Sequence, residues 1–403
     1  MEWKTEPLGD IAFMTSGGTP SSKISAYYEN GTIPWVRSGE LENGAIRDTE
    51  IKITQAGLDN SSAKIFPKGT LLIALYGATI GKLAYLDIDA CTNQAVCGIF
   101  ENDKVSLKYL YYFLLFHRPD LVKQGVGGAQ SNISQTILKK LMVSYPVDKT
   151  EQLRIVARIE ELFSELDNGV ETLQKTKRQL TVYRQAVLKD AFDRAGDNPL
   201  TLKEIIEKPR YGTSKKCSYD TDEHSIPVYR IPNINYQQGT ISHNDLKYAT
   251  FTQDEFDSLR LCEGDILIIR SNGSVSLVGR SAVVSETDTC GLFAGYLMRL
   301  RIKAGVKILP QYLNLYLNTH YARFQIEQMA KSTSGVNNIN SDEICRINLP
   351  VCDIELQTKI IQEIESRLSV CDSIEKTVDT ALQQAEAMRQ SILKQAFEGR
   401  LDK

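Results

Sequence analysis

The chain has 403 residues, of which 42% are hydrophobic and 24% charged, and its formal net charge is −3. This length exceeds what one hydrophobic core usually organises, so we expect at least two domains. No apolar run approaches the roughly 18 residues of a membrane span, and the N-terminus lacks an apolar signal core, so we expect a cytoplasmic protein. The eight cysteines form no C-x-x-C pair and the four histidines are scattered, which argues against a metal site or a disulfide framework.

Residues 1–149 combine short β-rich runs with one compact helical stretch. The runs include TLLIALYG and AVCGIF, and turns rich in glycine, asparagine and aspartate separate them. LKYLYYFLLFH follows and has the length and composition of a helix. The pattern predicts an α+β globular domain over residues 1–149.

Residues 150–196 have a different character. Proline disappears after Pro146, glycine becomes rare, and apolar residues recur every seven positions. Such a heptad predicts a long helix that uses one apolar seam to contact another helix. The expected seam residues here are Ile159, Leu162, Leu166, Leu173, Leu180 and Val187.

Residues 197–403 repeat the same plan. The runs DILIIRS and YLMRLRI and the helical stretch LPQYLNLYLNTHYARFQIEQMA predict a second α+β domain over residues 197–350. Residues 351–403 predict a second long helix. Its expected seam residues are Ile364, Cys371, Ile374, Val378, Met388 and Ile392.

The two halves also share motifs in the same order. RQAVLKDAF ends at Phe192 and RQSILKQAF ends at Phe397, and six of the nine residues are identical. IPWVR in the first half likewise corresponds to IPVYR in the second. A long seam needs a partner along its length, so we expect the two helices to form an antiparallel intramolecular coiled coil that separates two domains related by a pseudo-twofold. Leu188, Phe192, Leu393 and Phe397 are expected to close the ends of this coil. The alternative is two ordinary amphipathic helices, each packed on its own domain.

Seven stretches stand out for their order along the chain and for the long helix that follows each set: GGTPSSK, YYENGTIPWVRSGELENG, FPKGTLLIALYGATIGKLAYL, TNQAVCGI, GAQSNIS, YPVDKTEQLRIVARIEEL and RQAVLKDAF. In these motifs the chain resembles the specificity (S) subunits of type I restriction-modification systems over its full length. The second half departs from the pattern at Gly212-Thr213-Ser214, which lacks the proline, and at Tyr229, where the first half has Val36.

The resemblance implies a non-catalytic DNA-binding subunit. Each globular domain would be a target recognition domain for one half of a bipartite sequence, and the coiled coil would set the unread spacer. Two modification subunits would dock on it, for which we consider residues 151–158, residues 356–363 and the repeated tails. Those partners would bind S-adenosylmethionine and methylate adenine, and restriction subunits of the nuclease-translocase type would use ATP and Mg; no cofactor is expected in this chain.

Base recognition needs paired donors and acceptors, and phosphates need cations. For Arg37, a salt bridge with Glu40 or Glu42 is an equal alternative, and the turns at Gly81-Lys82 and Gly279-Arg280 have a purely structural alternative. The DNA-binding candidates are Lys23, Arg37, Ser38, Tyr76, Thr79, Lys82, Gln130, Ser131 and Asn132 in the first half, and Lys215, Lys216, Arg230, Asn233, Arg270, Ser271, Asn272, Ser274, Arg280, Asn337 and Asn338 in the second.

Three other functions remain open at this point. GATIGKL is similar to a phosphate loop, but it has three residues between its glycines and Leu83 after the lysine, so a phosphate-handling enzyme is disfavoured. Balanced charge in both globular halves also permits a coiled-coil scaffold with no DNA specificity. An orphan methyltransferase assembly or a type II relative would use a very similar chain.

Overall fold

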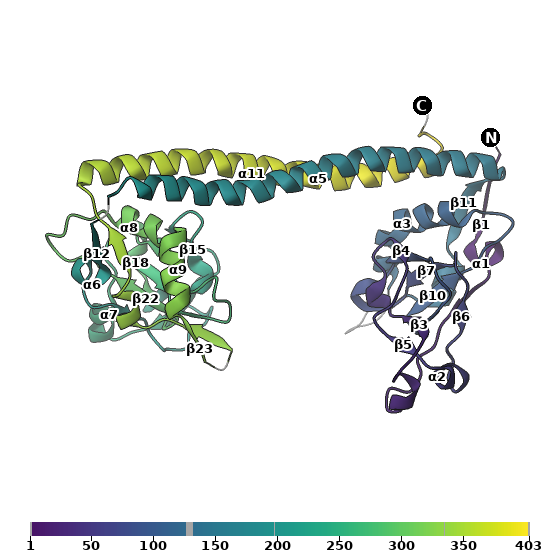
Figure 1. The fold of residues 1–403 in the computed structure, drawn as a ribbon, viewed down its shortest axis with the longest axis horizontal. Coiled ribbons are helices and arrows are strands. Elements are labelled where there is room, and N and C mark those ends of the chain that lie inside the picture. The colour runs from purple at the N-terminus through teal and green to yellow at the C-terminus, as the bar shows by residue number, and fades with distance from the viewer. Residues whose placement is uncertain (1, 126–131, 197, 334, 402–403) are drawn as a thin grey trace. The chain divides into compact units, whose positions relative to one another are not determined.

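The computed structural model describes residues 2–125, 132–196, 198–333 and 335–401. The chain forms two compact units (Figure 1). Unit 1 consists of Met1–Leu173 with Thr380–Lys403, and unit 2 consists of Gln174–Asp379. Each unit therefore has a globular part and a portion of each of two long helices, α5 (Lys149–Asp193) and α11 (Ile354–Phe397). The mixed α and β composition agrees with the predicted class.

The globular part of unit 1 contains two main sheets. One has the order β2-β10-β7-β8-β4 and the other the order β5-β3-β9-β6, while β1 pairs with β11 in antiparallel fashion. The strands are β1 (Trp3–Pro7), β2 (Met14–Ser16), β3 (Ile33–Val36), β4 (Ala45–Ile46), β5 (Lys52–Ile53), β6 (Ile65–Phe66), β7 (Leu71–Ala74), β8 (Leu83–Leu86), β9 (Ala90–Thr92), β10 (Val96–Ile99) and β11 (Met142–Pro146). The helices are α1 (Leu8–Ile11), α2 (Gln55–Asp59), α3 (Leu107–Gln124) and α4 (Gln135–Lys139), with 3-10 turns η1 (Ser25–Tyr27), η2 (Ser38–Glu40) and η3 (Gly77–Thr79).

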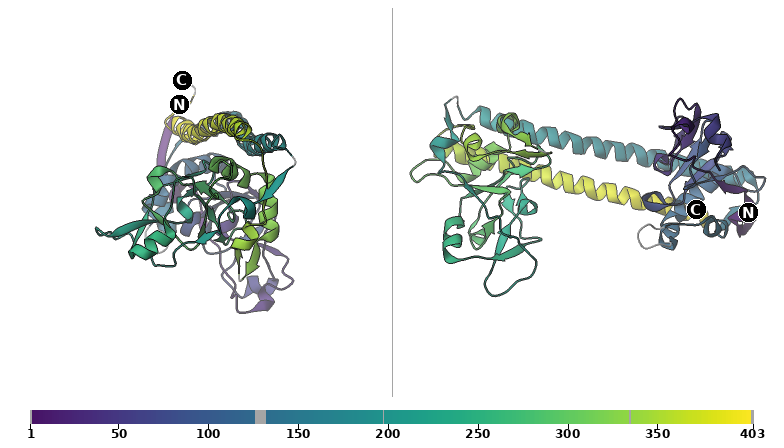
Figure 2. Two further views of the ribbon diagram at one scale, coloured as in Figure 1. Left: turned by 90° about the vertical axis from the view of Figure 1, so that its left-hand side faces the viewer. Right: turned by 90° about the horizontal axis from the view of Figure 1, so that it is seen from below.

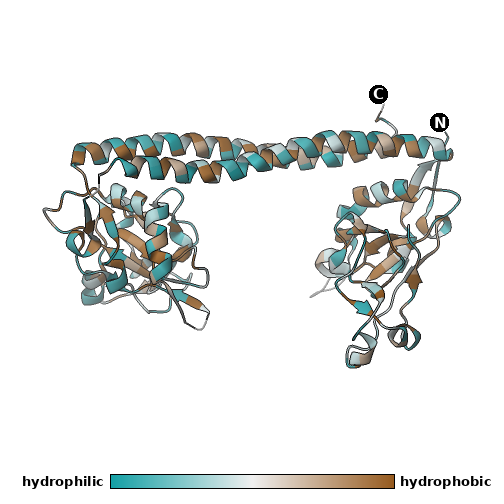
Figure 3. Cartoon of the chain, viewed as in Figure 1, coloured by the Kyte–Doolittle hydropathy of each residue, from teal (hydrophilic) through white to brown (hydrophobic). Residues whose placement is uncertain are grey.

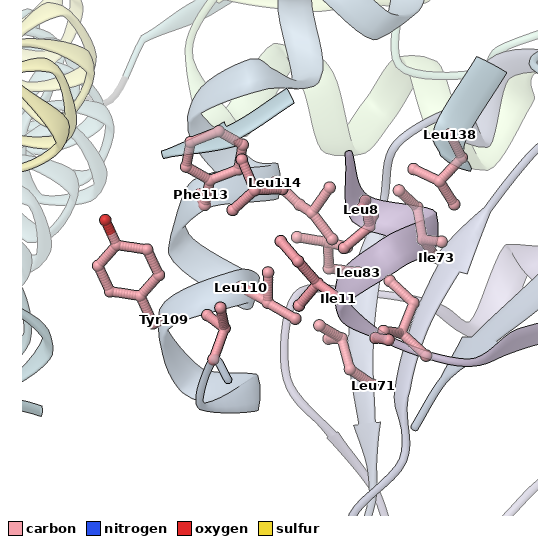
Figure 4. Close-up of a cluster of buried hydrophobic side chains, with 14 of the residues drawn as sticks. Leu8, Ile11, Leu71, Ile73, Leu83, Tyr109, Leu110, Phe113, Leu114 and Leu138 are labelled. Carbon is pink, nitrogen blue, oxygen red and sulfur yellow. The ribbon is translucent and has the colours of Figure 1, made fainter. Parts of the chain in front are cut away.

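Helix α3 covers the sheet that contains β7 and β8. Ser106 begins the helix, because its hydroxyl accepts a hydrogen bond from the amide of Tyr109. Leu110 and Leu114 on one face of α3 are fully buried against Ile73 and Leu83 (Figure 4). Burial of side chains of this size stabilises a fold by roughly 1.5–3 kcal/mol each. Trp35, Phe66 and Leu75 are also buried.

The globular part of unit 2 follows a similar plan. Its sheets have the orders β13-β22-β18-β20, β17-β14-β21 and β19-β24-β23, with the pairs β15-β16 and β12-β25. The strands are β12 (Pro199–Thr201), β13 (Arg210–Tyr211), β14 (Ser225–Tyr229), β15 (Ile234–Asn235), β16 (Thr240–Ile241), β17 (Lys247–Thr250), β18 (Ile266–Ile269), β19 (Ser271–Asn272), β20 (Ser281–Val283), β21 (Leu292–Phe293), β22 (Leu297–Leu300), β23 (Lys331–Thr333), β24 (Val336–Asn338) and β25 (Asn348–Pro350). The helices are α6 (Leu202–Ile205), α7 (Gln253–Leu259), α8 (Pro310–Leu317), α9 (His320–Met329) and α10 (Ser341–Ile344), with η4 (Ile231–Asn233) and η5 (Glu286–Asp288).

The second helical stretch is divided at Thr319, which the sequence pattern does not indicate. The Thr319 hydroxyl donates to the carbonyl of Tyr316 at 2.7 Å and accepts from the amide of Ala322 at 3.2 Å. The same side chain therefore closes α8 and caps α9.

The two units repeat a set of backbone hydrogen bonds around one strand end. In unit 1 the Leu75 amide donates to the carbonyl of Ala95 at 2.8 Å, and in unit 2 the Arg270 amide donates to the carbonyl of Tyr296 at 2.9 Å. The carbonyls of Leu75 and Arg270 in turn accept from equivalent amides. These and similar bonds make a residue of unit 1 equivalent to one of unit 2 in each of the following pairs, with unit 1 named first: Leu75/Arg270, Ala95/Tyr296, Ile133/Ile339, Gly17/Gly212, Val96/Leu297 and Ala74/Ile269.

Helices α5 and α11 run side by side in opposite directions within each unit (Figure 2). In unit 2, Lys177 pairs with Asp379 and Arg184 with Asp372, both at 2.7 Å, so the residue number falls on α11 as it rises on α5. The hydrogen bond with Asp379 raises the pKa of Lys177. In unit 1, Arg389 of α11 pairs with Asp167 of α5. Hydrophilic and hydrophobic residues alternate along both helices (Figure 3).

The predicted seam is right for one row of side chains and wrong for the other. Ile374 and Met388 are 40% and 54% exposed, so they do not belong to it. The second row instead lies four residues after each member of the first, and it contains polar residues such as Arg184 and Glu375. The sequence pattern predicts the wrong second row, because apolar side chains such as Ile374 lie three residues after members of the first row, where a heptad normally places its second contact. Of the remaining seam residues, Ile159, Leu180, Val187, Ile364, Cys371 and Val378 are buried, and Leu162, Leu166, Leu173 and Ile392 are partly buried.

The repeated tails RQAVLKDAF and RQSILKQAF anchor the helix ends on the globular parts. The ring centroid of Phe397 lies 5.3 Å from the ring centroids of both Tyr109 and Phe113 of α3. Phe192 lies 5.0 Å from Tyr312 and 5.3 Å from Tyr316 of α8. The same clusters contain the beginning of the other long helix, as expected for residues that close the coil, and each tail is in addition part of a domain core.

The beginnings of the long helices are joined to the same cores by buried glutamines. Gln152 is 0% exposed; its amide group donates to the carbonyls of Lys104 at 2.9 Å and Pro146 at 2.8 Å, and its oxygen accepts from the Ser106 amide at 2.9 Å. Gln357, also 0% exposed, makes the equivalent three bonds in unit 2. Each globular part thus holds the beginning of one long helix and the end of the other.

Candidate nucleic-acid interface

Arg37 and Arg230 occupy equivalent positions at the ends of β3 and β14. The guanidinium of Arg37 pairs with Glu50 and lies 3.5 Å from Glu40, so part of the salt-bridge alternative is present. Arg230 pairs with Asp245 at 2.9 Å. The hydrogen bond from the Tyr219 hydroxyl, together with Arg230, lowers the pKa of Asp245. Both arginines are partly exposed beside a carboxylate, which leaves their role in DNA contact a prediction.

The two glycine-basic turns have a structural role. Gly81 and Gly279 have φ of +71° and +84°, a backbone region that glycine adopts at low cost. The helix that covers the sheet supports each turn: Arg118 of α3 donates to the carbonyl of Ile80, and Arg323 of α9 donates to the carbonyl before Gly279. The structural alternative therefore describes these turns well.

The side chain of Arg280 is held within this same corner. It donates to Asn318 at 2.9 Å and to the carbonyl of Ser276 at 3.2 Å, and it lies over the ring of Tyr236. Burial lowers the pKa of Arg280. These contacts are internal to unit 2, so they favour the structural alternative over DNA contact.

Exposed and partly exposed polar and aromatic side chains lie on the strands and turns next to Arg270 in unit 2. The Arg270 guanidinium lies 4.9 Å from the ring centroid of Tyr211 and donates to the carbonyl of Gly295 at 3.0 Å. Next to it Tyr296 is 63% exposed. Asn337 pairs with Asn272 across β24 and β19. We call Tyr211, Arg270, Asn272, Tyr296 and Asn337 the rim of unit 2.

The equivalent position in unit 1 has different side chains on the same framework. Tyr76 is exposed and forms a β-bridge with Asn132, as Ser271 does with Asn338 in unit 2. Leu75, which replaces the arginine, is buried. The two units therefore share the backbone arrangement at this place, but the side chains that they expose there differ.

Two predicted DNA-binding residues are corrected by burial. Asn233 is 0% exposed; its amide group donates to the carbonyls of Ser242 and Asn244, so it stabilises a turn. Ser271 is 4% exposed within β19. Side chains buried to this extent have no free surface with which to meet a base edge.

The remaining candidates stay predictions. Lys215 is bound to Glu255 at 2.6 Å and lowers the pKa of that carboxyl by its hydrogen bond. Gln130 and Ser131 lie outside the described residues. Lys23, Lys216, Asn132 and Ser274 are exposed, and Ser38, Thr79, Lys82, Asn272, Asn337 and Asn338 are partly exposed.

Sequence reasoning missed Tyr211 and Tyr296. Both follow or precede a glycine in a turn, in RYG and AGYL, and an exposed tyrosine next to a strand resembles any core aromatic when only the pattern is available. Only the fold places them beside Arg270.

Within the described residues, no group of three or more histidine, cysteine, aspartate or glutamate side chains could hold a metal ion. Nor does any helix in that part of the chain have the length and apolar character to cross a membrane.

Comparison with known proteins finds a matching family model and several similar chains. Residues 1–179 match the type I restriction modification DNA specificity domain. The chain is 25% identical to the StySPI specificity subunit of Salmonella potsdam and 23% identical to the EcoKI specificity subunit of Escherichia coli (strain K12); each match covers 99% of this chain and 89% of the relative.

Solved structures share the fold over nearly the whole chain. A chain from a study of complex assembly and conformational transition of the type I R-M system has a TM-score of 0.78 at 17% identity, covering 99% of this chain and 98% of its own. The HsdS subunit from Thermoanaerobacter tengcongensis has a TM-score of 0.54 at 17% identity, covering 99% and 97%. The first 179 residues thus match this specificity domain, and the chain is similar over nearly its full length to specificity subunits of type I restriction enzymes.

Proposed function

We propose that the chain is a sequence-specific DNA-binding subunit that recognises a bipartite target and directs adenine methylation and restriction by partner subunits. The globular parts of units 1 and 2 would be target recognition domains, each specific for one half-site. Helices α5 and α11 would form one antiparallel coiled coil, with the two domains related by a pseudo-twofold, and would set the unread spacer. The chain itself would have no catalytic role.

The repeated framework around Leu75 and Arg270 is the observation that supports this proposal best. Two domains that recognise different half-sites need the same architecture with different exposed groups. Equivalent backbone bonds support Ala95 in unit 1 and Tyr296 in unit 2, and the exposed side chains around them differ. A scaffold without DNA specificity has no need for this combination of conserved geometry and changed chemistry.

The partners would dock on the long helices. Apolar side chains that the globular parts leave uncovered are available there: Leu153 and Ile354 near the helix beginnings, and Tyr183 and Ile374 further along. Two modification subunits would bind S-adenosylmethionine, and restriction subunits would supply ATP- and Mg-dependent cleavage. Because the globular halves have balanced charge, the isolated chain should bind DNA weakly and gain affinity in the assembly.

Genome-wide mapping of N6-methyladenine tests the function directly. Cells that express the chain with its neighbouring methyltransferase subunit should methylate a motif of two short halves around a fixed gap, and cells without the chain should not. Methylation that is absent, or unchanged by removal of the chain, would favour the scaffold. DNA binding that weakens steeply with salt while keeping a sequence preference would exclude the scaffold.

A further inference from the structure

Among the differences between the two frameworks, one replaces a buried apolar side chain with a cation. Leu75 and Arg270 have equivalent backbone hydrogen bonds, yet Leu75 points its side chain into the core of unit 1. Arg270 is partly exposed. The neighbouring position changes from the buried Ala95 to the exposed Tyr296. Unit 2 therefore has a cation next to an exposed tyrosine where unit 1 has the buried Leu75 and Ala95.

The guanidinium of Arg270 is oriented by its surroundings. One terminal nitrogen donates to the carbonyl of Gly295 at 3.0 Å, and the group lies over the ring of Tyr211 at 4.9 Å. Its Nε is buried and has no hydrogen-bond partner among the residues that the structure describes. A stacked guanidinium loses less conformational freedom on binding, because its plane is already set.

Tyr211 is held in turn by the backbone. Its hydroxyl accepts a hydrogen bond from the Ser341 amide at 3.0 Å, and its strand pairs with β22 at Met298. The ring is therefore attached to α10 at one end and to the sheet at the other. This makes Tyr211 a positioning residue for Arg270.

We infer that Arg270, positioned by Tyr211, recognises a guanine in the half-site of unit 2. The inference rests on the proposed DNA-binding function. A planar arginine that donates from two nitrogens matches the O6 and N7 acceptors that guanine presents in the major groove. No acidic side chain is paired with Arg270 in the described structure, in contrast to Arg37, Arg230 and Lys215. Leu75 cannot supply these donors, so the half-site of unit 1 must be recognised by other groups.

The experiment uses the complete chain assembled with its methyltransferase subunit. Methylation motifs are mapped for the wild type, Arg270→Ala, Arg270→Lys, Tyr211→Ala and Tyr211→Phe. Arg346→Ala is the matched control, since Arg346 is an exposed arginine of the same unit outside the rim. With Arg270→Ala, one guanine position in one half should become degenerate, with discrimination falling about 5- to 150-fold, while the other half stays unchanged.

The positioning role of Tyr211 makes a separate demand. Tyr211→Ala should relax the same guanine position, and Tyr211→Phe should keep the preference because the ring remains. The purified complexes are also titrated with the wild-type duplex and with duplexes in which that base pair is replaced. The wild type should prefer guanine at this position, whereas Arg270→Lys should lose the preference and keep the overall affinity. Thermal unfolding of each variant identifies any that does not fold. If an alanine variant does not fold, Arg270→Lys or Tyr211→Phe tests the proposal in its place.

The outcomes are distinguishable. If the wild type yields a bipartite motif but Arg270→Ala leaves it unchanged, or relaxes both halves equally, or relaxes only an A·T position, the guanine assignment is wrong and the proposed function stands. If the wild type yields no bipartite motif, the proposed function itself fails.

Discussion

The buried glutamine Gln152 provides a strong test of how α5 is joined to the globular part of unit 1. In Gln152→Leu the side chain keeps a similar volume but loses three hydrogen bonds of 2.8–2.9 Å. Neutral hydrogen bonds contribute about 1 kcal/mol each, and groups left unpaired in a buried site cannot regain a bond to water. Gln152 is 0% exposed, so we expect unit 1 to lose about 3 kcal/mol or more.

Urea unfolding of the complete chain, monitored together with hydrogen exchange, measures this loss. The Ser106 amide should exchange much faster in Gln152→Leu, because its acceptor is removed. Gln357→Leu should destabilise unit 2 by a similar amount without affecting Ser106. Gln174→Leu is the control, since Gln174 lies exposed on the same helix. A loss of unfolding free energy of 0.5 kcal/mol or less in Gln152→Leu, or an unchanged exchange rate of the Ser106 amide, would show that Gln152 does not hold α5 on the globular part of unit 1.

Three further predictions concern packing. Phe397→Ala should destabilise unit 1 by about 3–5 kcal/mol in thermal or urea unfolding, because the side chain contacts α3 aromatics; an effect below 1 kcal/mol would mean that the tail is not anchored. Between the long helices, Leu180→Ala should destabilise the chain by about 2–5 kcal/mol and Arg184→Ala by about 1 kcal/mol or less, since Leu180 is buried and the carboxylate partner of Arg184, Asp372, is exposed to solvent; equal effects would contradict this ranking. Gly17→Ala should destabilise unit 1 by about 1–3 kcal/mol, because a Cβ would lie 2.0 Å from the carbonyl oxygen of Thr92; wild-type stability would show that the strands separate easily.

The candidate site divides into residues that sequence could identify and residues that it could not. Arg270 and Asn272 follow an apolar strand and precede Gly273, so their place in an exposed turn is a local property that the sequence expresses. Asn233 has the same composition signal, but its burial depends on carbonyls that lie nine and eleven residues further along the chain. Tyr211 is distant from Arg270 in sequence and reaches it only through the pairing of β13 with β22.

The sequence by itself determined the α and β composition, the two long helices and the resemblance to type I specificity subunits, because these depend on periodicity and on motifs repeated in order. The apolar row at Leu180, Val187 and Cys371 was also visible, since a seven-residue repeat is a local pattern. Only the tertiary structure decided which face completes the contact between α5 and α11. A heptad allows the second row of contacts to lie either three or four residues after the first, and after Cys371 these positions are Ile374, which is apolar, and Glu375, which is polar. The tertiary structure also decided that the repeated tails join the domain cores, since the aromatic rings they contact lie in a separate part of the chain and meet them only in the folded protein.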